Sequence, residues 1–98
     1  MAARVVWSAN AKHDLKEILA YWVYRNKSKT YSKKLNYLIN KAIEEIVMYP
    51  KAGKLTSVKD VRAKIIGDYT IFFEEKNNKI YLLRIWDTRQ NPERLTGL

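Results

Sequence analysis

Residues 61–87 read VRAKIIGDYTIFFEEKNNKIYLLRIWD, and this stretch decides the fold. It holds three runs rich in β-branched and aromatic residues, which are typical of strands: Val61 to Ile66, Tyr69 to Glu75 and Ile80 to Asp87. Gly67-Asp68 separates the first two runs and Lys76-Asn77-Asn78-Lys79 separates the last two, so both connections are short enough for hairpin turns. We therefore predict a three-stranded antiparallel meander.

The residues before the meander repeat their apolar side chains with a helical period. One stripe is Ala11, Leu15, Ile18, Leu19, Trp22 and Val23, and the other is Leu35, Leu38, Ile39, Ala42, Ile43, Ile46 and Val47. Pro50 cannot continue the second helix. The polar run from Arg25 to Thr30 lacks the period and predicts the turn of an antiparallel helical hairpin, with Thr30 or Ser32 as the second cap.

The first residues complete the predicted fold. Arg4 to Trp7 looks like a short strand ahead of Ser8-Ala9-Asn10, which can cap a helix, and we expect that strand to join an edge of the sheet. A helical hairpin cannot bury its apolar stripe alone, so it should lie on one face of the meander and leave the other face open. The prediction is an α+β fold in a single domain over residues 1–98.

Composition narrows the class of protein. The first residues contain no signal peptide and no segment approaches the roughly 18 apolar residues of a membrane helix, so we expect a cytoplasmic location and no membrane partner. Without cysteine there is no disulfide, thiolate catalysis or cysteine zinc site. The chain has 19 Lys and Arg against 10 Asp and Glu, a formal charge of +9. Such a field attracts polyanions, but an acidic protein partner or a need for solubility explains it too.

The predicted strands bring basic and aromatic residues together. Side chains alternate across a strand, so Arg62 and Lys64 should share one face while the apolar Val61, Ala63 and Ile65 turn toward the helices. On the last strand, Arg84 and Trp86 point together with Ile80 and Leu82. If Arg62, Lys64, Arg84 and Trp86 meet on the open face, they form a basic concavity with an aromatic platform, which suits a phosphate backbone and a stacked base. The other contributors would be Arg89 just beyond the strand and Lys51 and Lys54 on the preceding loop.

Each of these residues also has a purely structural interpretation. Arg62 and Lys64 alone are typical of the solvated half of an amphipathic strand. Arg84 interrupts an apolar run, so we expect it to pair with a carboxylate such as Asp87 or Glu74 rather than to reach a ligand. Trp86 and Tyr69 fit a core position at a sheet end, and Trp7 and Trp22 belong to the core because they lie on apolar stripes.

The sequence contains no recognisable metal or cofactor motif. His13 lies on the polar shoulder of the first helix with no second histidine or cysteine, so we interpret it as a surface residue. There is no Ser-His-Asp arrangement and no glycine-rich phosphate loop. We expect neither a metal nor a cofactor, and any catalysis would rest on Lys, Arg, Tyr and carboxylates.

Three segments, in this order and at these spacings, make the chain resemble the toxins of RelE/ParE toxin–antitoxin modules: Asp14-Leu15-Lys16-Glu17-Ile18, Tyr49-Pro50-Lys51-Ala52-Gly53, and Arg84-Ile85-Trp86-Asp87-Thr88-Arg89-Gln90-Asn91-Pro92. The resemblance covers nearly the whole chain. It implies a bacterial growth-arresting toxin of a type II system, held inactive by an antitoxin that is acidic or partly disordered and binds DNA. It does not indicate which residues bind the antitoxin.

Two activities occur in this superfamily, and the fold alone does not choose between them. RelE-like members cut messenger RNA on the ribosome with basic residues and a tyrosine, a pattern that Arg62, Lys64 and Arg89 would fit as catalytic residues. ParE-like members poison DNA gyrase without known catalytic residues. Cleaving members carry an arginine just after the strand tyrosine, where this chain has Thr70, and a C-terminal tyrosine that falls near Leu95 here. These two departures and the long helical hairpin favour the ParE-like activity, while Arg84 and Tyr81 are the residues that could compensate for the departures in a cleaving toxin.

Three hypotheses therefore remain at the level of sequence. The first is a ParE-like toxin that acts by binding, with gyrase as its target. The second is a ribosome-dependent endoribonuclease, and the third is an inactive or purely DNA-associated basic module with no effect on growth. If the second holds, Arg62→Ala with Arg89→Ala should abolish RNA cleavage and leave the fold intact, because both residues are expected to be exposed.

Overall fold

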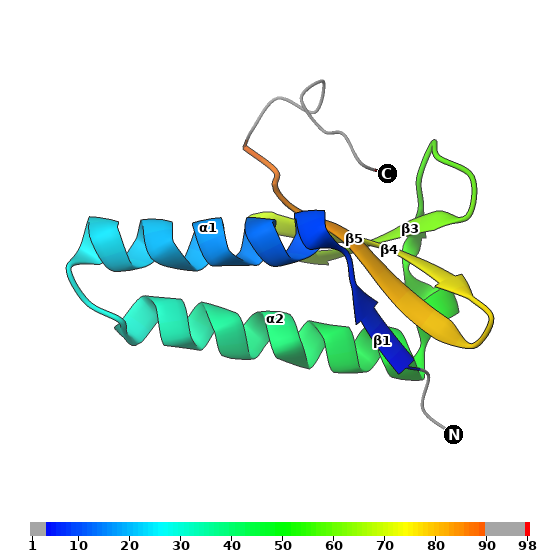
Figure 1. The fold of residues 1–98 in the computed structure, drawn as a ribbon, viewed down its shortest axis with the longest axis horizontal. Helices are drawn as coiled ribbons and strands as arrows, with labels where there is room; N and C mark the ends of the chain where they lie inside the picture. Colours follow the sequence, from blue (N-terminus) through cyan, green and yellow to red (C-terminus); the bar gives the residue numbers. More distant parts are fainter. Residues whose placement is uncertain (1–3, 90–97) are drawn as a thin grey trace.

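The computed structural model describes residues 4–89 and residue 98, and it has the predicted α+β architecture. Two antiparallel helices lie along one face of a sheet, and the closed end of their hairpin projects beyond it (Figure 1). The elements in chain order are β1 (Arg4–Trp7), α1 (Ala9–Asn26), α2 (Thr30–Met48), the 3-10 turn η1 (Pro50–Ala52), β2 (Lys54–Leu55), β3 (Val61–Ile66), β4 (Tyr69–Lys76) and β5 (Lys79–Asp87). The first strand, the hairpin and the meander are confirmed.

The helices begin and end for identifiable local reasons. The Ser8 hydroxyl caps α1 by accepting a hydrogen bond from the Ala11 amide at 3.0 Å, and it donates to the Leu83 carbonyl at 2.9 Å. This one side chain therefore fixes the start of α1 against β5. At the other end, Lys27 takes the left-handed conformation at φ 53°, which ends α1 and opens the turn. Pro50 follows directly after the last turn of α2, as predicted.

The sheet has the strand order β1-β5-β4-β3-β2. The N-terminal strand lies at an edge, as expected, and pairs in parallel with the last strand, Val5 opposite Ile80. The short strand β2 pairs with β3 inside what the sequence predicted to be a plain loop. The core lies between the helices and the sheet, where the most buried side chains come from both layers: Ile39 and Ile46 of α2, Ile71 and Phe73 of β4, and Ile80, Leu82 and Ile85 of β5. Burying each contributes about 1.5–3 kcal/mol.

A bulge in β5 changes which residues share a face. Phe72 pairs with Arg84 but Phe73 pairs with Leu82, so Leu83 is an extra residue on β5. The alternation of side chains therefore resets at that point. Leu82 and Ile85 both lie in the core, while Arg84 turns to the opposite face. The prediction that Arg84 and Trp86 share a face with Ile80 and Leu82 is wrong for this reason.

The predicted orientation of β3 is also wrong. Arg62 lies opposite the buried Phe73, and Lys64 lies opposite the buried Ile71, so both basic residues are on the face that α2 covers. Ala63, predicted to face the helices, pairs instead with Phe72 on the other face. The alternation along β3 is as expected, but the two faces are exchanged. Within residues 4–89, neither helix combines the length and apolar character that a membrane span requires.

Candidate functional site

Arg62 holds the loop that follows α2. Its Nη1 donates hydrogen bonds to the carbonyl oxygens of Gly53, at 2.8 Å, and Lys51, at 3.2 Å. Gly53 is necessary for this approach, because a Cβ there would stand 2.6 Å from the ring of Phe73 and 3.2 Å from Cβ of Arg62. The guanidinium is therefore engaged in the fold. Arg62 is half-buried, which corrects the expectation that it is exposed.

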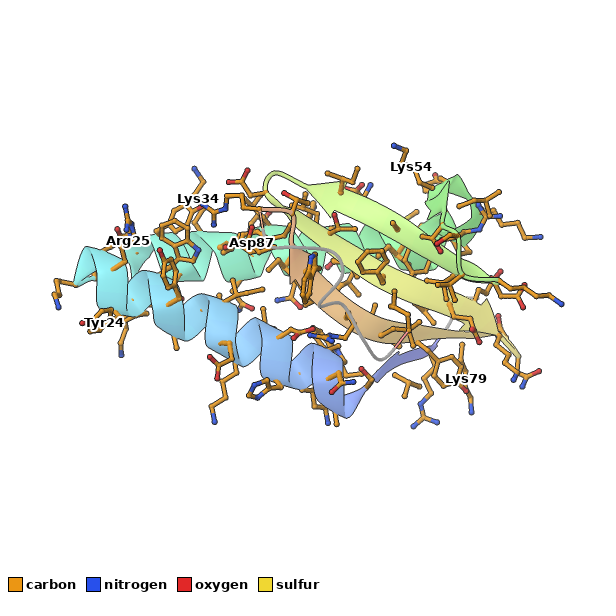
Figure 2. All side chains as sticks on the ribbon, turned by 90° about the horizontal axis from the view of Figure 1, so that it is seen from above. Tyr24, Arg25, Lys34, Lys54, Lys79 and Asp87 are labelled. Atoms are coloured by element: carbon orange, nitrogen blue, oxygen red, sulfur yellow. The ribbon has the colours of Figure 1, made fainter. Side chains whose placement is uncertain are left out.

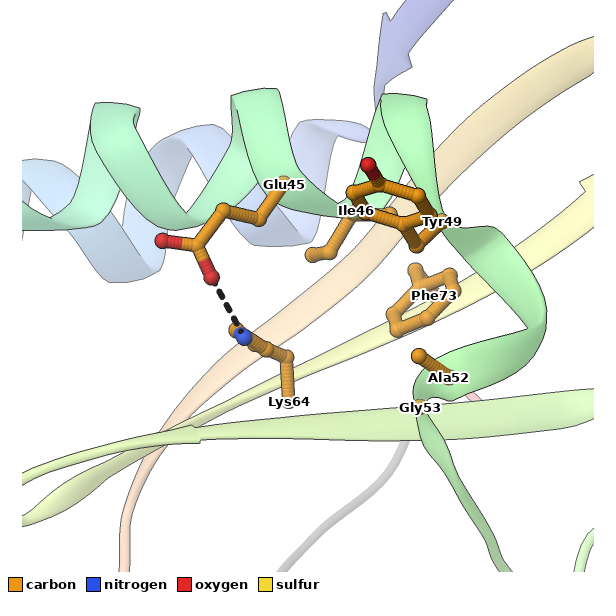
Figure 3. A pocket seen from close by; sticks show the side chains of 7 residues that line it. All are labelled: Glu45, Ile46, Tyr49, Ala52, Gly53, Lys64 and Phe73. Carbon is orange, nitrogen blue, oxygen red and sulfur yellow. Dashed lines mark hydrogen bonds and ion pairs between the residues drawn. The ribbon is translucent and has the colours of Figure 1, made fainter.

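Lys64 forms an ion pair with the helix above it. Its ammonium donates to Oε2 of Glu45, on α2, at 2.8 Å (Figure 3). This contact holds the pKa of the Glu45 carboxyl below its usual value. The pair stands at one side of a hollow of about 190 Å³, whose other walls include Tyr49 and Phe73. The hollow is small, and Lys64 already has its counterion at its rim.

Arg84 has a partner that the sequence did not suggest. Asp14, on α1, accepts two hydrogen bonds from its guanidinium, from Nε at 2.7 Å and from Nη2 at 2.9 Å. The same carboxylate accepts the backbone amide of Ile85 at 3.0 Å. Only 14% of the Arg84 side chain and 11% of the Asp14 side chain is exposed, and the contact raises the pKa of Arg84 above its usual value. Pairing was predicted, but with Asp87 or Glu74.

Trp86 packs beside this ion pair. The guanidinium carbon of Arg84 lies 5.4 Å from the centre of the Trp86 ring, so the two residues do point together, as predicted. The indole Nε1 is buried, and none of the residues that the structure describes accepts a hydrogen bond from it. The ring therefore serves as a packing surface for Arg84, and it is only partly exposed.

The far end of β5 gathers a second set of polar groups. Tyr69 is buried, and its hydroxyl accepts a hydrogen bond from Nε1 of Trp22 at 2.7 Å; burial raises the pKa of that hydroxyl. Arg89 is exposed and donates to the Asp87 carboxylate at 2.8 and 3.0 Å, which lowers the pKa of Asp87. A shallow depression of about 440 Å³ between these residues and α1 is bordered by Glu17 and Tyr21 as well.

The remaining predicted site residues are exposed. Lys51 and Lys54 lie on η1 and β2, at the end of the molecule away from the hairpin turn, and Figure 2 labels Lys54 there. His13 is a surface residue, as predicted, and its Nε2 lies 3.6 Å from Oε1 of Glu17. Among residues 4–89, no group of histidines and carboxylates is arranged to hold a metal ion. The expected C-terminal tyrosine position, Leu95, lies outside the described residues.

The structure divides the predicted basic set. Arg62 and Lys64 lie on the helix face of β3, whereas Arg84 and Trp86 lie on the opposite face of β5. Arg89 comes two residues after Asp87, which is paired across the sheet with Tyr69 and, through it, with Ile66. Ile66 is four residues from Arg62 on β3, so this end of the sheet lies about 13 Å along the strands from Arg62. The predicted concavity, with all four of Arg62, Lys64, Arg84 and Trp86 on one open face, is therefore not formed.

Two features escaped the sequence interpretation. One is Asp14, which the sequence places on the polar side of the first helix like an ordinary surface charge. The signal that could have identified it is its position directly before the apolar Leu15, at the border of the apolar stripe. The other is the closed end of the helical hairpin, where four exposed tyrosines stand among lysines: Tyr21, Tyr24, Tyr31 and Tyr37. Their positions are visible in the sequence as residues off the apolar stripes.

Comparisons with known proteins agree with this fold. Residues 5–92 match the family model described as the ParE toxin of the type II toxin–antitoxin system parDE. The fold is similar to a chain of the chromosomal ParDE toxin–antitoxin system from P. aeruginosa, with a TM-score of 0.79 and 20% identity over 89% of this chain and 97% of that one. It is also similar to a chain of the RelBE2 toxin–antitoxin complex from Mycobacterium tuberculosis, with a TM-score of 0.61 and 15% identity over 89% and 99% of the two chains. No curated protein sequence matches the chain.

Proposed function

Because the chain belongs to the ParE toxins of type II toxin–antitoxin systems, we propose that it arrests growth by poisoning DNA gyrase when its antitoxin does not neutralise it. The observation that carries this proposal is the family match, which spans residues 5–92 and names the ParE branch of the superfamily. The fold is that of a RelE/ParE toxin, which is compatible with either target.

The engagement of the basic residues supports action by binding. A ribonuclease site needs its basic groups gathered around one phosphate, with a group that can accept a proton. Arg62 is bound to loop carbonyls, Lys64 to Glu45, and Arg89 to Asp87 at the other end of the sheet. Arginine also stays protonated and is a poor general base. The alternative, a ribosome-dependent endoribonuclease using Arg62, Lys64 and Arg89, would require these pairs to open and the residues to converge.

A type II toxin is neutralised by a cognate antitoxin, and we further propose the chemistry of that partner. The chain carries a formal charge of +9, so an acidic segment would be attracted to it. A partly disordered antitoxin that also binds DNA would fit this charge and would cover an extended surface as it folds.

The test is induced expression without antitoxin, with growth, messenger RNA ends and gyrase-linked DNA breaks measured in the same cells. We expect growth arrest with DNA breaks and intact messages, and rescue by co-expressed antitoxin. New codon-phased RNA ends without breaks would overturn the proposal in favour of the ribonuclease. Normal growth would leave only a basic DNA-associated module.

A paired variant sharpens the test. Lys64→Gln with Arg89→Gln removes two of the three candidate catalytic groups and leaves the bonds of Arg62 to the loop in place. A gyrase poison should retain its toxicity in this variant, whereas a ribonuclease that uses these residues should lose it. If the variant loses its toxicity while its fold and its antitoxin binding are unchanged, the result contradicts the proposed gyrase poisoning and supports the ribonuclease.

A further inference from the structure

The distal half of the helical hairpin contains basic residues and no acidic one, and its charge is offset at the boundary, where Glu45 lies one helical turn after Lys41. Residues 18–43 contain six of the 19 basic residues and none of the 10 acidic ones. They also contain four of the seven tyrosines. The basic residues are Arg25, Lys27, Lys29, Lys33, Lys34 and Lys41. We call residues 18–43 the hairpin tip.

The hairpin tip is accessible. The closed end of the hairpin projects beyond the sheet (Figure 1), and Figure 2 shows Tyr24, Arg25 and Lys34 at that end of the molecule. On α2 the residues Lys34, Tyr37 and Lys41 follow one another at helical spacing, on the side away from the buried Ile39, and all three are exposed. The tip therefore presents a row of hydrogen-bond donors about 10 Å long.

This charge pattern opposes the stability of α2. Lys29 and Lys33 are like charges four residues apart, a spacing at which they repel each other across one turn. The first turn of α2 has no acidic residue, and its N-cap Lys29 makes no side-chain capping bond, so cations stand where the helix dipole favours anions. A surface that served only solubility would mix both signs. Local features that conflict with stability are expected at functional surfaces.

Three of the four tyrosine rings of the tip contact another side chain, although all four rings remain exposed. Trp22 makes edge contacts with Tyr21 and Tyr31, at centroid distances of 5.1 and 4.7 Å, and the ammonium of Lys27 covers the ring of Tyr24 at 4.5 Å. Binding single-stranded nucleic acid uses free ring faces on which bases stack. Here the tip offers mainly ammonium and hydroxyl groups, which are the donors that contact the phosphates of a double helix.

We propose that the hairpin tip binds the phosphate backbone of double-stranded DNA. The contact is independent of base sequence, because it uses charge and hydroxyl donors on a convex helical surface. It does not depend on the gyrase target, since the surface can hold DNA whatever enzyme the toxin acts on.

The experiment measures binding of the purified full chain to a short mixed-sequence duplex and to one of its single strands, between about 50 and 200 mM salt. The tip variant is Lys33→Gln, Lys34→Gln and Lys41→Gln, three exposed helix positions where glutamine is also well tolerated. The matched control removes three ammonium groups from the other end of the molecule, by Lys59→Gln in the loop before β3 and by Lys76→Gln and Lys79→Gln at the two ends of the β4–β5 turn (Figure 2 labels Lys79). Both variants lower the net charge from +9 to +6.

We expect the duplex to bind more tightly than the single strand. The tip variant should lose at least about 30-fold in duplex affinity at 0.1 M salt, and its log–log salt slope should fall by about 2 to 3, while the control changes both much less. Equal losses in the two variants would reduce the binding to a general charge effect and overturn the proposal. Tighter binding to the single strand, or no binding to the duplex at the lowest salt, would overturn it as well. Retained helicity and retained gyrase poisoning in the tip variant would separate this result from the proposed target.

Discussion

Replacing Asp14 tests whether one carboxylate joins the two layers of the fold. It lies on α1 and accepts three hydrogen bonds from β5, two from the Arg84 guanidinium and one from the Ile85 amide. With side-chain exposures of 11% and 14%, the ion pair is mostly shielded from water. Asp14→Ala removes all three acceptor contacts at once and leaves the donors in place.

The expected cost follows from what is left behind. A buried donor without an acceptor costs about 1–3 kcal/mol, and breaking a buried ion pair costs about 3–5 kcal/mol. Arg84 keeps other contacts, including the ring of Trp86, and residual exposure admits some water, so we expect Asp14→Ala to lower the free energy of unfolding by about 2–3 kcal/mol. For a domain of this size that lowers Tm by roughly 10–20 °C. Asp14→Asn keeps an acceptor for the Ile85 amide and should cost less.

Urea unfolding followed by tryptophan fluorescence gives the measurement, with the slope m expected to stay constant. The control is Glu17→Ala, one turn further along α1, whose side chain is 69% exposed and lies 3.6 Å from the His13 imidazole. We expect the control to change the free energy of unfolding by less than about 0.5 kcal/mol. If Asp14→Ala and Glu17→Ala cost the same, the ion pair does not hold α1 to β5 and the reasoning is refuted.

Three further substitutions test other parts of the structure. Gly53→Ala would place a methyl 2.6 Å from the ring of Phe73, so urea unfolding should show a loss of about 1–3 kcal/mol; an unchanged midpoint would mean that the loop moves freely. Trp22→Phe removes a hydrogen bond that lowers the pKa of Tyr69, so the hydroxyl should ionise at still higher pH in an ultraviolet titration, and a lower value would contradict the burial assigned to it. The pKa of the Glu45 carboxyl is lowered in the folded state, so the contribution of its ion pair to the free energy of unfolding is present above the ordinary glutamate pKa and is lost as pH falls through the folded pKa. In an NMR titration, Lys64→Met should therefore raise the pKa of Glu45, and an unchanged pKa would contradict the ion pair.

The periodic parts of the fold were predictable because burial imposes the period. Apolar side chains recur every three or four residues in the helices, so the hairpin and its end before Pro50 followed from the sequence. Along β3 the alternation was also correct, but alternation alone does not say which face is covered. Arg62 and Lys64 can lie under α2 because each finds a polar partner there, in loop carbonyls and in Glu45.

The candidate site was harder to predict because it depends on one inserted residue. The bulge at Leu83 inserts one residue into β5 between the pairs Phe73–Leu82 and Phe72–Arg84. Every side chain of β5 after Leu83 therefore lies on the face opposite to the one that a regular strand would give it. Nothing in the run Leu82-Leu83-Arg84 indicates where the extra residue falls. The partner of Arg84 then comes from α1, 70 residues earlier in the chain, and only the packed structure brings the two together.

The hairpin tip allows a variant in which stability and binding should change in opposite directions. Lys33→Glu replaces a like-charge pair with Lys29 by an attractive one, at a spacing of four residues, and puts an acid near the N-terminus of α2 where the dipole favours it. We expect it to raise the free energy of unfolding by about 0.5–1 kcal/mol while it weakens binding to duplex DNA. Urea unfolding and a salt titration of DNA binding on the same preparation measure both. A variant that gains stability and keeps its DNA affinity would show that the cations at the start of α2 are not needed for binding, and it would contradict the role proposed for the hairpin tip.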